Sequence, residues 1–167
     1  MEKIKIISNS PNDTLKIAKT IASKLKIGDT IVLTGELGAG KTKFTEGFLS
    51  FFNMQDEISS PTFNIVNEYT SNDTNIYHFD VYRLENSDEF YAIGGDEYFE
   101  KGISIIEWGE IIEDALPNEY LKIVFQKDTN NENKRILSIC SIGNKYTSII
   151  NKLKEDFHED IKYWYIK

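Results

Sequence analysis

The chain has 167 residues, of which 40% are hydrophobic and 28% are charged, and its formal net charge is −8. This composition is typical of one soluble globular domain, and we find neither an apolar run of eighteen residues nor a secretion signal, so we expect a cytoplasmic protein. The acidic balance, with Arg83 and Arg135 as the only arginines, argues against tight unaided binding to nucleic acid.

In the first half of the chain, apolar periodicity predicts alternating strands and helices. Apolar residues at three-to-four spacing predict a helix over residues 11–26, ended by Gly28. A second amphipathic helix is predicted over residues 41–52. Short apolar runs predict four strands, over residues 4–7, 29–34, 63–69 and 75–82, and the polar segment 71–74 predicts a hairpin between the last two.

The second half of the chain continues the same alternation. Residues 103–106 form a continuous apolar run of the kind buried on both faces of a parallel sheet. The remaining predicted elements are a helical or irregular connector over 86–100 broken at Gly94 and Gly95, a short helix over 110–116, strands over 121–125 and 135–142, and a last helix from Lys145 towards His158.

Strands that alternate with helices, together with hairpin-linked strands, predict the fold class. We expect an α/β fold with a mixed sheet flanked by helices, a three-layer sandwich of the kind found in P-loop NTPases. We find no internal repeat and no linker, so residues 1–167 are predicted to form one domain, with a C-terminal helix and tail from about residue 145.

The most informative segment is a glycine-rich loop, TGELGAGKTKF, that follows the apolar run TIVL. Gly35, Gly40, Lys41 and Thr42 fit the phosphate-binding pattern of two glycines separated by four residues and followed by Lys-Thr. Glycines allow backbone N–H groups to surround a phosphate, and the following helix directs its positive end to the same place. Lys41 would reach the β- and γ-phosphates, and the Thr42 hydroxyl would bind Mg²⁺.

Chemistry on a magnesium–nucleotide complex also requires a carboxylate at the end of a neighbouring strand. Asp80 follows the run IYHF, and Glu107 follows the run ISII. A carboxylate at the end of a fully apolar strand is costly unless a metal or a hydrogen bond compensates it. This argument favours Glu107 on the metal side and Asp80 as the residue that orients water or a group beside the metal ligands.

Other residues near these motifs have two interpretations. His78 points to the same side of its strand as Asp80, but a lone strand histidine is more often a packing residue. Trp108 is either a core residue or a cover over the nucleotide. Thr62 lies in a segment, SSPT, that is a turn by composition and could also respond to the γ-phosphate. Cys140, the single cysteine, lies in an apolar run and is interpreted as a core residue.

Four motifs in order resemble the TsaE family of small bacterial ATPases required to form threonylcarbamoyladenosine at position 37 of tRNAs. They are GELGAGKT, SPTFNIVNEY, YHFDVYRL and IIEWGE. The resemblance extends from about residue 12 to 135. The family often has Pro or Ala where this chain has Gly109, and the tail after about residue 151 matches no family motif.

The resemblance implies a role for individual residues in a site that binds ATP or ADP with Mg²⁺. Thr14 would lie on the adenine side, and Arg135 would be a basic residue near the nucleotide. Asp80 would support turnover, Thr62 would belong to a switch-like segment, and Trp108 would lie beside the metal ligand. The phosphate cradle would comprise Gly38, Ala39, Gly40, Lys41 and Thr42, and the Mg²⁺ site would comprise Thr42 and Glu107.

The resemblance also implies partners. The family does not transfer the threonylcarbamoyl group itself but acts on the TsaB–TsaD pair, and tRNA is contacted only through these partners. The chain carries no arginine suited to complete the site, so we expect slow ATP hydrolysis by the protein alone and faster hydrolysis with partners.

The sequence leaves three alternative functions open. A small-molecule kinase built on the same loop would need more arginines than two. A GTPase switch would need an Asn-Lys-x-Asp segment, which is absent. A nucleotide-dependent binding module with incidental hydrolysis would use the same residues as an ATPase, so sequence does not separate the two.

Overall fold

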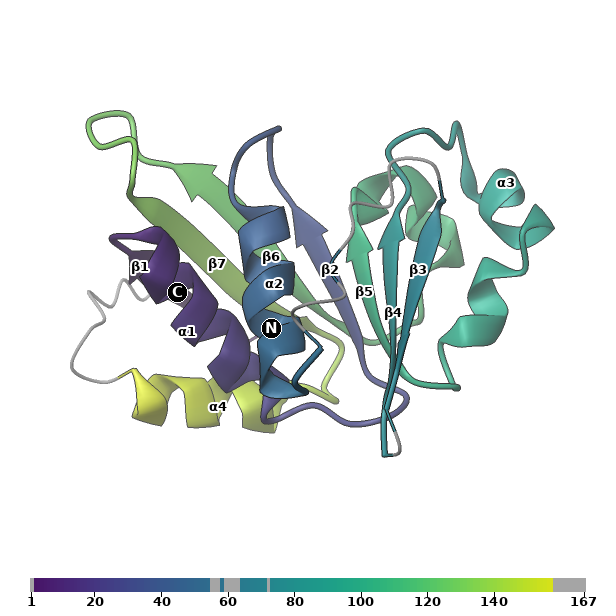
Figure 1. Ribbon diagram of the computed structural model, residues 1–167, viewed down its shortest axis with the longest axis horizontal. Helices are drawn as coiled ribbons and strands as arrows, with labels where there is room; N and C mark the ends of the chain where they lie inside the picture. The colour runs from purple at the N-terminus through teal and green to yellow at the C-terminus, as the bar shows by residue number, and fades with distance from the viewer. Residues whose placement is uncertain (1, 55–57, 59–63, 72, 158–167) are drawn as a thin grey trace.

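The computed structural model describes residues 2–54, 58, 64–71 and 73–157 (Figure 1). Thr62 and the tail from residue 158 therefore lie outside the described part of the chain. In that part, the strands are β1 (Lys3–Ser8), β2 (Thr30–Thr34), β3 (Val66–Thr70), β4 (Asn75–Asp80), β5 (Ile103–Glu107), β6 (Tyr120–Lys127) and β7 (Arg135–Ile142). The helices are α1 (Pro11–Ala22), α2 (Lys41–Phe51), α3 (Ser87–Ala92), α4 (Thr147–Asp156) and the 3₁₀ helices η2 (Gly95–Tyr98) and η3 (Gly109–Ala115).

The strands form a single seven-stranded mixed sheet in the order β1-β7-β6-β2-β5-β4-β3. The four central strands are parallel, because β2 pairs in parallel with β5 and β6, and β4 pairs in parallel with β5. Antiparallel pairs close both edges: β1 and β6 flank β7, and β3 forms the predicted hairpin with β4. The mixed sheet predicted from the sequence is thus confirmed.

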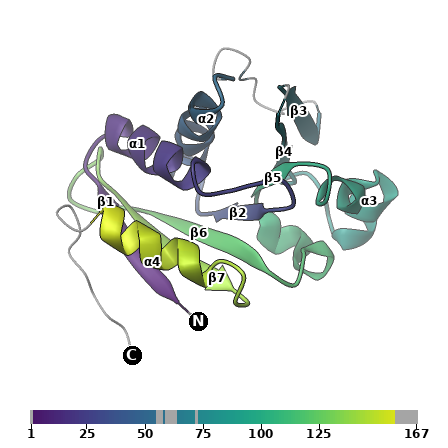
Figure 2. The ribbon, with the colours of Figure 1, turned by 90° about the horizontal axis from the view of Figure 1, so that it is seen from below.

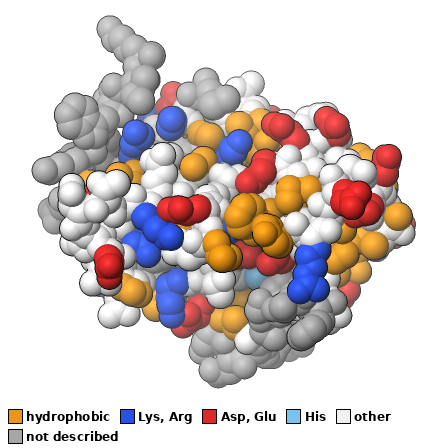
Figure 3. Space-filling model, turned by 90° about the horizontal axis from the view of Figure 1, so that it is seen from above, with side chains coloured by type: hydrophobic (Ala, Val, Ile, Leu, Met, Phe, Trp, Pro, Cys, Tyr) orange, Lys and Arg blue, Asp and Glu red, His pale blue; other side chains and the backbone are white. Residues whose placement is uncertain are grey.

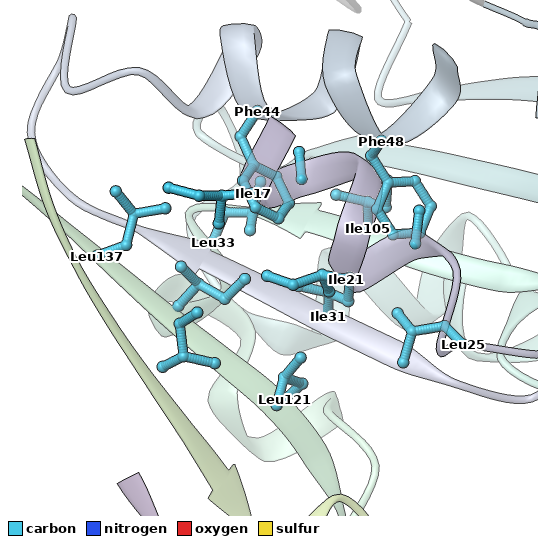
Figure 4. Close-up of a cluster of buried hydrophobic side chains, with 14 of the residues drawn as sticks. Ile17, Ile21, Leu25, Ile31, Leu33, Phe44, Phe48, Ile105, Leu121 and Leu137 are labelled. Carbon is cyan, nitrogen blue, oxygen red and sulfur yellow. The ribbon is translucent and has the colours of Figure 1, made fainter. Parts of the chain in front are cut away.

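Helices lie on both sides of the sheet, which confirms the three-layer arrangement (Figure 2). On one side, α1, α2 and α4 share a large hydrophobic cluster with the sheet, part of which is drawn in Figure 4. On the other side, a smaller cluster joins α3 and η3 to β4 and β5. Strand β2 is buried along its whole length, because Ile31 and Leu33 belong to the large cluster whereas Val32 faces Gly109 of η3.

Several element ends differ from the sequence prediction. The first helix stops at Ala22 rather than residue 26, because Lys24 and Leu25 donate to carbonyls only three residues back and form turns. The last helix begins at Thr147 and ends at Asp156, inside the predicted span. The third strand begins at Val66, three residues later than predicted. The predicted break in the connector is confirmed: Gly94 adopts a φ of +70° between α3 and η2.

In the described part of the chain, no helix is long and apolar enough to cross a membrane.

Helices α1 and α2 cross closely at Gly47. A Cβ atom on Gly47 would lie 2.6 Å from the Leu15 carbonyl oxygen and 3.0 Å from the Ala18 Cβ. Backbone atoms cannot move aside as the end of a flexible side chain can, so this close crossing requires glycine. The contact matters for the site because it fixes α2, which carries Lys41 at its first position, against the rest of the core.

We therefore predict that Gly47→Ala lowers the free energy of unfolding by about 1–3 kcal/mol through overpacking, although alanine favours helix. Urea denaturation followed by circular dichroism measures this change. Lys19→Ala, on the exposed side of α1, is the control and should change stability by less than about 0.5 kcal/mol. Equal stability of Gly47→Ala and the wild type would contradict the close-crossing explanation.

Candidate functional site

The glycine-rich loop connects β2 to α2 in a conformation that depends on its glycines. Gly35, Gly38 and Gly40 have φ values of +141°, +73° and +110°, in the region that side chains disfavour. A Cβ atom on Gly35 would also lie 2.7 Å from the carbonyl oxygen of Phe125, on the neighbouring strand β6. The path therefore leaves no room for a side chain at Gly35, and a side chain at Gly38 or Gly40 would strain the backbone.

The beginning of α2 is open to an anion. Gly40 is the N-cap residue and supplies no side-chain hydrogen bond, and the first turn of the helix contains no acidic residue. The first N–H groups of a helix have no intrahelical acceptors, and the helix dipole places partial positive charge at the same end. The loop and helix together therefore have the geometry and the charge that suit an anionic group such as the phosphate predicted from the sequence.

The Lys41 ammonium group is held at the cradle by the loop itself. Its Nζ donates to the carbonyl oxygens of Gly35, at 2.6 Å, and Glu36, at 3.0 Å. It also lies 4.2 Å from the centroid of the Trp108 ring. Burial lowers the pKa of Lys41, and the nearby carboxylates of Glu107, Glu110 and Asp80 partly oppose this shift. A cation that is short of solvent and bound to neutral carbonyls is suited to exchange them for an anionic ligand.

The two predicted carboxylates meet at one edge of the sheet. Asp80 is the last residue of β4, Glu107 is the last residue of β5, and the two are direct partners in the parallel ladder. Leu33, near the end of β2, is the ladder partner of Glu107 on its other side. The parallel register thus brings both carboxylates beside the loop that follows β2.

These side chains share one cavity of about 470 Å³. Its size is in the range of small-ligand sites. Its lining includes the loop and helix residues Gly38, Ala39, Gly40, Lys41 and Thr42, and the sheet residues His78, Asp80, Glu107 and Trp108. The structure therefore brings together all the predicted residues of the phosphate cradle and both carboxylates.

His78 and Glu107 form a buried polar pair inside this cavity. His78 is 3% exposed and Glu107 is 5% exposed, and Nε2 of His78 lies 3.6 Å from Oε1 of Glu107. Within the described residues, neither ring nitrogen of His78 nor Oε1 of Glu107 has a hydrogen-bond partner. Buried polar atoms normally have partners, so atoms left without them at a cavity wall are suited to bind a ligand, a metal or its water. The sequence favoured packing as the role of His78, and packing does not explain these bare nitrogens.

Asp80 is the less buried carboxylate. Its Oδ1 accepts a hydrogen bond of 3.1 Å from the backbone N–H of Tyr82, just beyond the strand. Burial raises the pKa of Asp80 above its usual value, whereas this hydrogen bond works in the opposite direction. A carboxylate with a raised pKa at the wall of a cavity is typical of a group that accepts or orients a proton.

Trp108 forms one wall of the site through an unusual backbone conformation. Its φ is +63°, which is uncommon for a bulky side chain, and its N–H donates to the Leu33 carbonyl at 3.1 Å. This turn directs the ring towards Lys41 on one side and Tyr82 on the other, 5.0 Å between ring centroids. Gly109 then packs directly on β2, since a Cβ there would lie 2.5 Å from Cγ1 of Val32.

A second, smaller pocket of about 130 Å³ lies beside the cradle. Its lining includes Thr14 at the start of α1, Gly40 just before α2, Lys43 of α2, and Arg135 at the start of β7. The Nε of Arg135 donates to the Ala39 carbonyl at 3.1 Å, so the guanidinium helps to hold the loop in place. Thr14, predicted on the adenine side, and Arg135, predicted as a basic residue near the nucleotide, thus line one pocket beside the glycine-rich loop.

One cation near the loop was missed by the sequence analysis. Lys127, at the end of β6, donates to the Leu37 carbonyl at 3.0 Å, and its Nζ would lie 3.6 Å from a Cβ on Gly38. The available signal was a lysine at the end of a strand, but it becomes informative only once β6 is known to neighbour β2. Among the described residues, Lys127 thus joins Lys41 as a lysine whose ammonium group donates to carbonyl oxygens of the loop.

The donors available for a metal are few. The described residues include no group of three or more His, Cys, Asp or Glu side chains able to hold a metal ion by themselves. Thr42, exposed in the first turn of α2, and Glu107, with a bare buried oxygen, both line the cavity. This pair fits Mg²⁺, because that ion is usually held by one or two protein oxygens together with water and phosphate.

Comparison with known proteins agrees with the geometry. The family model described as threonylcarbamoyl adenosine biosynthesis protein TsaE matches residues 8–136, most of the chain. The chain belongs to the TsaE family. Membership places it in a family of tRNA threonylcarbamoyladenosine biosynthesis, which confirms the resemblance seen in the four sequence motifs.

Individual TsaE proteins match over most of their length. A Bacillus subtilis tRNA threonylcarbamoyladenosine biosynthesis protein TsaE is 39% identical over 162 residues, which cover 96% of this chain and 99% of the relative. The TsaE protein of Rickettsia felis is 36% identical, covering 89% of this chain and 86% of its own. The crystal structure of Bacillus subtilis YdiB superimposes with a TM-score of 0.77 at 35% identity, covering 93% of this chain and 96% of that one.

The raised pKa of Asp80 makes a prediction about stability and pH. The folded protein binds a proton at Asp80 more tightly than the unfolded chain does, so stability falls as pH rises between the unfolded and folded pKa values. Asp80→Asn has no ionisable carboxyl group at this position, so its stability does not fall with pH for this reason. We predict that, without ligands, Asp80→Asn is more stable than the wild type at pH 7, and that the gap closes below the usual pKa of an aspartate.

Urea denaturation at a series of pH values measures the gap. Asp88→Asn, at an exposed position in the first turn of α3, is the control for loss of one carboxylate. A gap between Asp80→Asn and wild type that stayed constant from acid to neutral pH would show that burial does not destabilise the charged form of Asp80.

Proposed function

We propose that this TsaE-family chain is a magnesium-dependent ATPase that serves threonylcarbamoyladenosine formation at position 37 of tRNAs reading codons that start with A. In this proposal it acts on the TsaB–TsaD complex and does not transfer the threonylcarbamoyl group itself. One observation carries the ATPase part: the glycine-lined cradle, Lys41 and two strand-end carboxylates line a single cavity. Family membership supports the pathway.

Within the proposal, each side chain has a physical task. Lys41 would leave the loop carbonyls of Gly35 and Glu36 for the β- and γ-phosphates, since a charge-assisted bond to an anion is stronger than one to a neutral oxygen. Thr42 and Glu107 would hold Mg²⁺, which when bound neutralises charge on the phosphates. Asp80 would orient the attacking water and accept its proton, in keeping with its raised pKa.

The adenine and ribose would lie towards the smaller pocket. A nucleotide with its phosphates in the cradle would extend past Gly40, where the pocket lined by Thr14, Lys43 and Arg135 begins. Trp108 covers the opposite, phosphate side of the site beside Lys41. ADP would use the same contacts except those to the γ-phosphate, and this difference gives a partner a way to distinguish the two nucleotides.

A partner is expected to complete the site. No arginine lines the cavity within the described residues, although phosphoryl-transfer sites commonly use one to stabilise transition-state charge. The rim of the site exposes large apolar side chains: Leu37 is 83% exposed and Tyr82 is 63% exposed. Figure 3 shows hydrophobic side chains gathered on this end of the molecule, with acidic side chains around them. Such a patch beside a catalytic cavity is typical of a protein interface.

Reconstitution of the pathway tests the proposal. An unmodified tRNA that reads codons starting with A would be incubated with TsaB, TsaC, TsaD, threonine, bicarbonate and ATP, with this protein present or omitted. We expect modification beyond one cycle only when the protein is present, and we expect Lys41→Ala to support none, because the variant cannot hold the phosphates. Equal modification without the protein, or with Lys41→Ala, would contradict the proposal.

The division of labour between the carboxylates gives a second prediction. Glu107→Gln should weaken ATP binding in the presence of Mg²⁺ by roughly tenfold or more while leaving the Mg²⁺-free affinity unchanged. Asp80→Asn should preserve Mg²⁺-dependent binding and lower the hydrolysis rate by about a hundredfold or more, as expected when a positioned proton acceptor is lost. Isothermal titration calorimetry and single-turnover hydrolysis measure the two effects. If Asp80→Asn weakened Mg²⁺-dependent binding and Glu107→Gln lowered only the hydrolysis rate, Asp80 would be the metal ligand and Glu107 the proton acceptor.

The alternatives named from the sequence make different predictions. A small-molecule kinase would yield a phosphorylated acceptor in place of free phosphate, and the cavity has no arginines of the kind such enzymes use, within the described residues. A GTPase would bind GTP in preference to ATP. A binding module with incidental hydrolysis would support tRNA modification with a nonhydrolysable ATP analogue, whereas an ATPase coupled to the cycle would not.

A further inference from the structure

The sheet has one face that the described helices cover only in part. On the side opposite α1, α2 and α4, the elements α3 and η3 cover the half of the sheet around β4 and β5. The half formed by β1, β7 and β6 has no helix over this side among the described residues (Figure 2). Half of one sheet layer is therefore open.

The strand register defines the side chains on this open face. Side chains alternate between the two faces of a strand, and Ile4, Ile6, Leu137 and Ile139 belong to the core on the other side. The residues between them form a grid of three rows, each running across β1, β7 and β6. The rows are Lys3, Cys140 and Lys122; then Lys5, Ser138 and Val124; then Ile7, Ile136 and Gln126. We call these nine residues the open sheet face.

The open sheet face is basic, although the protein as a whole has a net charge of −8. It contains Lys3, Lys5 and Lys122 and no acidic residue. None of these lysines forms an ion pair or a side-chain hydrogen bond with another described residue. Burial raises the pKa of the Cys140 thiol, and the charges of Lys122 and Lys3 partly oppose this shift, as expected for ammonium groups that lie close to the thiol.

Aliphatic side chains form the rest of the open sheet face. Ile7, Val124 and Ile136 are only partly buried, and they lie beside the lysine stems. Lysine stems commonly lie along apolar surface while their charged ends remain in water. The face therefore combines an apolar floor with unpaired positive charge.

We propose that the open sheet face binds an acidic amphipathic helix of a partner protein. The carboxylates of such a helix would pair with the three lysines, and its apolar stripe would cover the three aliphatic residues. Three adjacent strands span about 10 Å between the outer two, close to the diameter of a helix with its side chains. A helix docked there would cover this half of the sheet as α3 and η3 cover the other half.

The same residues fit a nucleic acid poorly. Recognition of single-stranded RNA relies on aromatic platforms for base stacking, and the nine residues of the open sheet face contain no aromatic side chain and no arginine. Three lysines in an acidic protein would also give a weak electrostatic attraction to a phosphate backbone. The surface is therefore assigned to a protein segment.

This inference does not rest on the proposed ATPase function. The open sheet face lies on the opposite side of the sheet from the nucleotide cavity, whose residues His78 and Glu107 project on the same side as Ile31 and Ile105 of the main core. Binding to this face therefore requires neither nucleotide nor Mg²⁺.

Cys140 provides a built-in reporter, because it is the only cysteine of the chain and lies in the first row of the grid. It is only 9% exposed, so its modification is slow without peptide, and a docked helix would remove the access that remains. The probe is a synthetic helical peptide of about 18 residues with a leucine stripe flanked by glutamates, and its control carries lysines in place of the glutamates. We expect a saturating amount of the glutamate peptide to slow modification of Cys140 by a neutral maleimide by about fivefold or more. The lysine peptide should leave the rate unchanged, and salt should weaken the protection.

Charge-reversal variants locate the binding surface. Lys3→Glu/Lys122→Glu should abolish the protection, whereas Lys19→Glu/Lys152→Glu makes the same change in net charge at exposed positions on α1 and α4 and should retain it. The modification rate of each variant with peptide is compared with its own rate without peptide, because the nearby charges also alter the reactivity of the thiol. Circular dichroism confirms that the variants are folded, and the salt dependence of the wild type tests the charge pairing without any substitution.

Several outcomes would overturn the proposal. No protection by the glutamate peptide, equal protection by the two peptides, or protection that persists in Lys3→Glu/Lys122→Glu would each exclude an acidic helix on this face. Protection by a short RNA alone would assign the face to nucleic acid. Protection that increases with protein concentration, without peptide, would assign it to a second copy of the chain. Faster modification in a chain that ends at Phe157 would assign it to residues 158–167.

Discussion

The site depends on the parallel register of three strands. Strands β2, β5 and β4 run in the same direction. The loop after β2 and the carboxylates that end β5 and β4 therefore lie together at the carboxyl-terminal ends of these strands. A shift of one residue in β5 would turn Glu107 to the other face, towards η3, and separate it from Lys41. The core beneath the site fixes the register, because Ile31, Ile105 and Leu33 are fully buried against α1 and α2.

Several features of the candidate site lower the stability of the folded protein. Glu107 and His78 are almost fully buried and have polar atoms without a partner among the described residues, Lys41 is partly desolvated, and Trp108 has a positive φ. Each of these features disfavours the folded protein without ligand. Together at the wall of one cavity, they indicate a site whose groups are arranged for a bound ligand rather than for stability.

Local patterns in the sequence predicted much of the fold and the site. The glycine loop was predictable because its spacing reports backbone geometry directly, and Asp80 and Glu107 were predictable because each ends an apolar strand. Lys127 was missed because its relevance depends on β6 lying next to β2, and periodicity does not reveal strand order. The first helix was predicted too long because Leu25 continues its apolar stripe, yet it is buried from a turn after α1 has ended. The open sheet face was also invisible, since it depends on which strands the helices cover.

A crystal structure with a nonhydrolysable ATP analogue and Mg²⁺ would show where the phosphates bind. We expect the β- and γ-phosphates in the loop after β2, with Lys41 moved from the Gly35 and Glu36 carbonyls onto them. We also expect Mg²⁺ bound by Thr42 and Glu107, and Asp80 within hydrogen-bond reach of a water beside the γ-phosphate. Phosphates bound elsewhere, or a metal held by Asp80 with Glu107 still paired to His78, would contradict the proposed site.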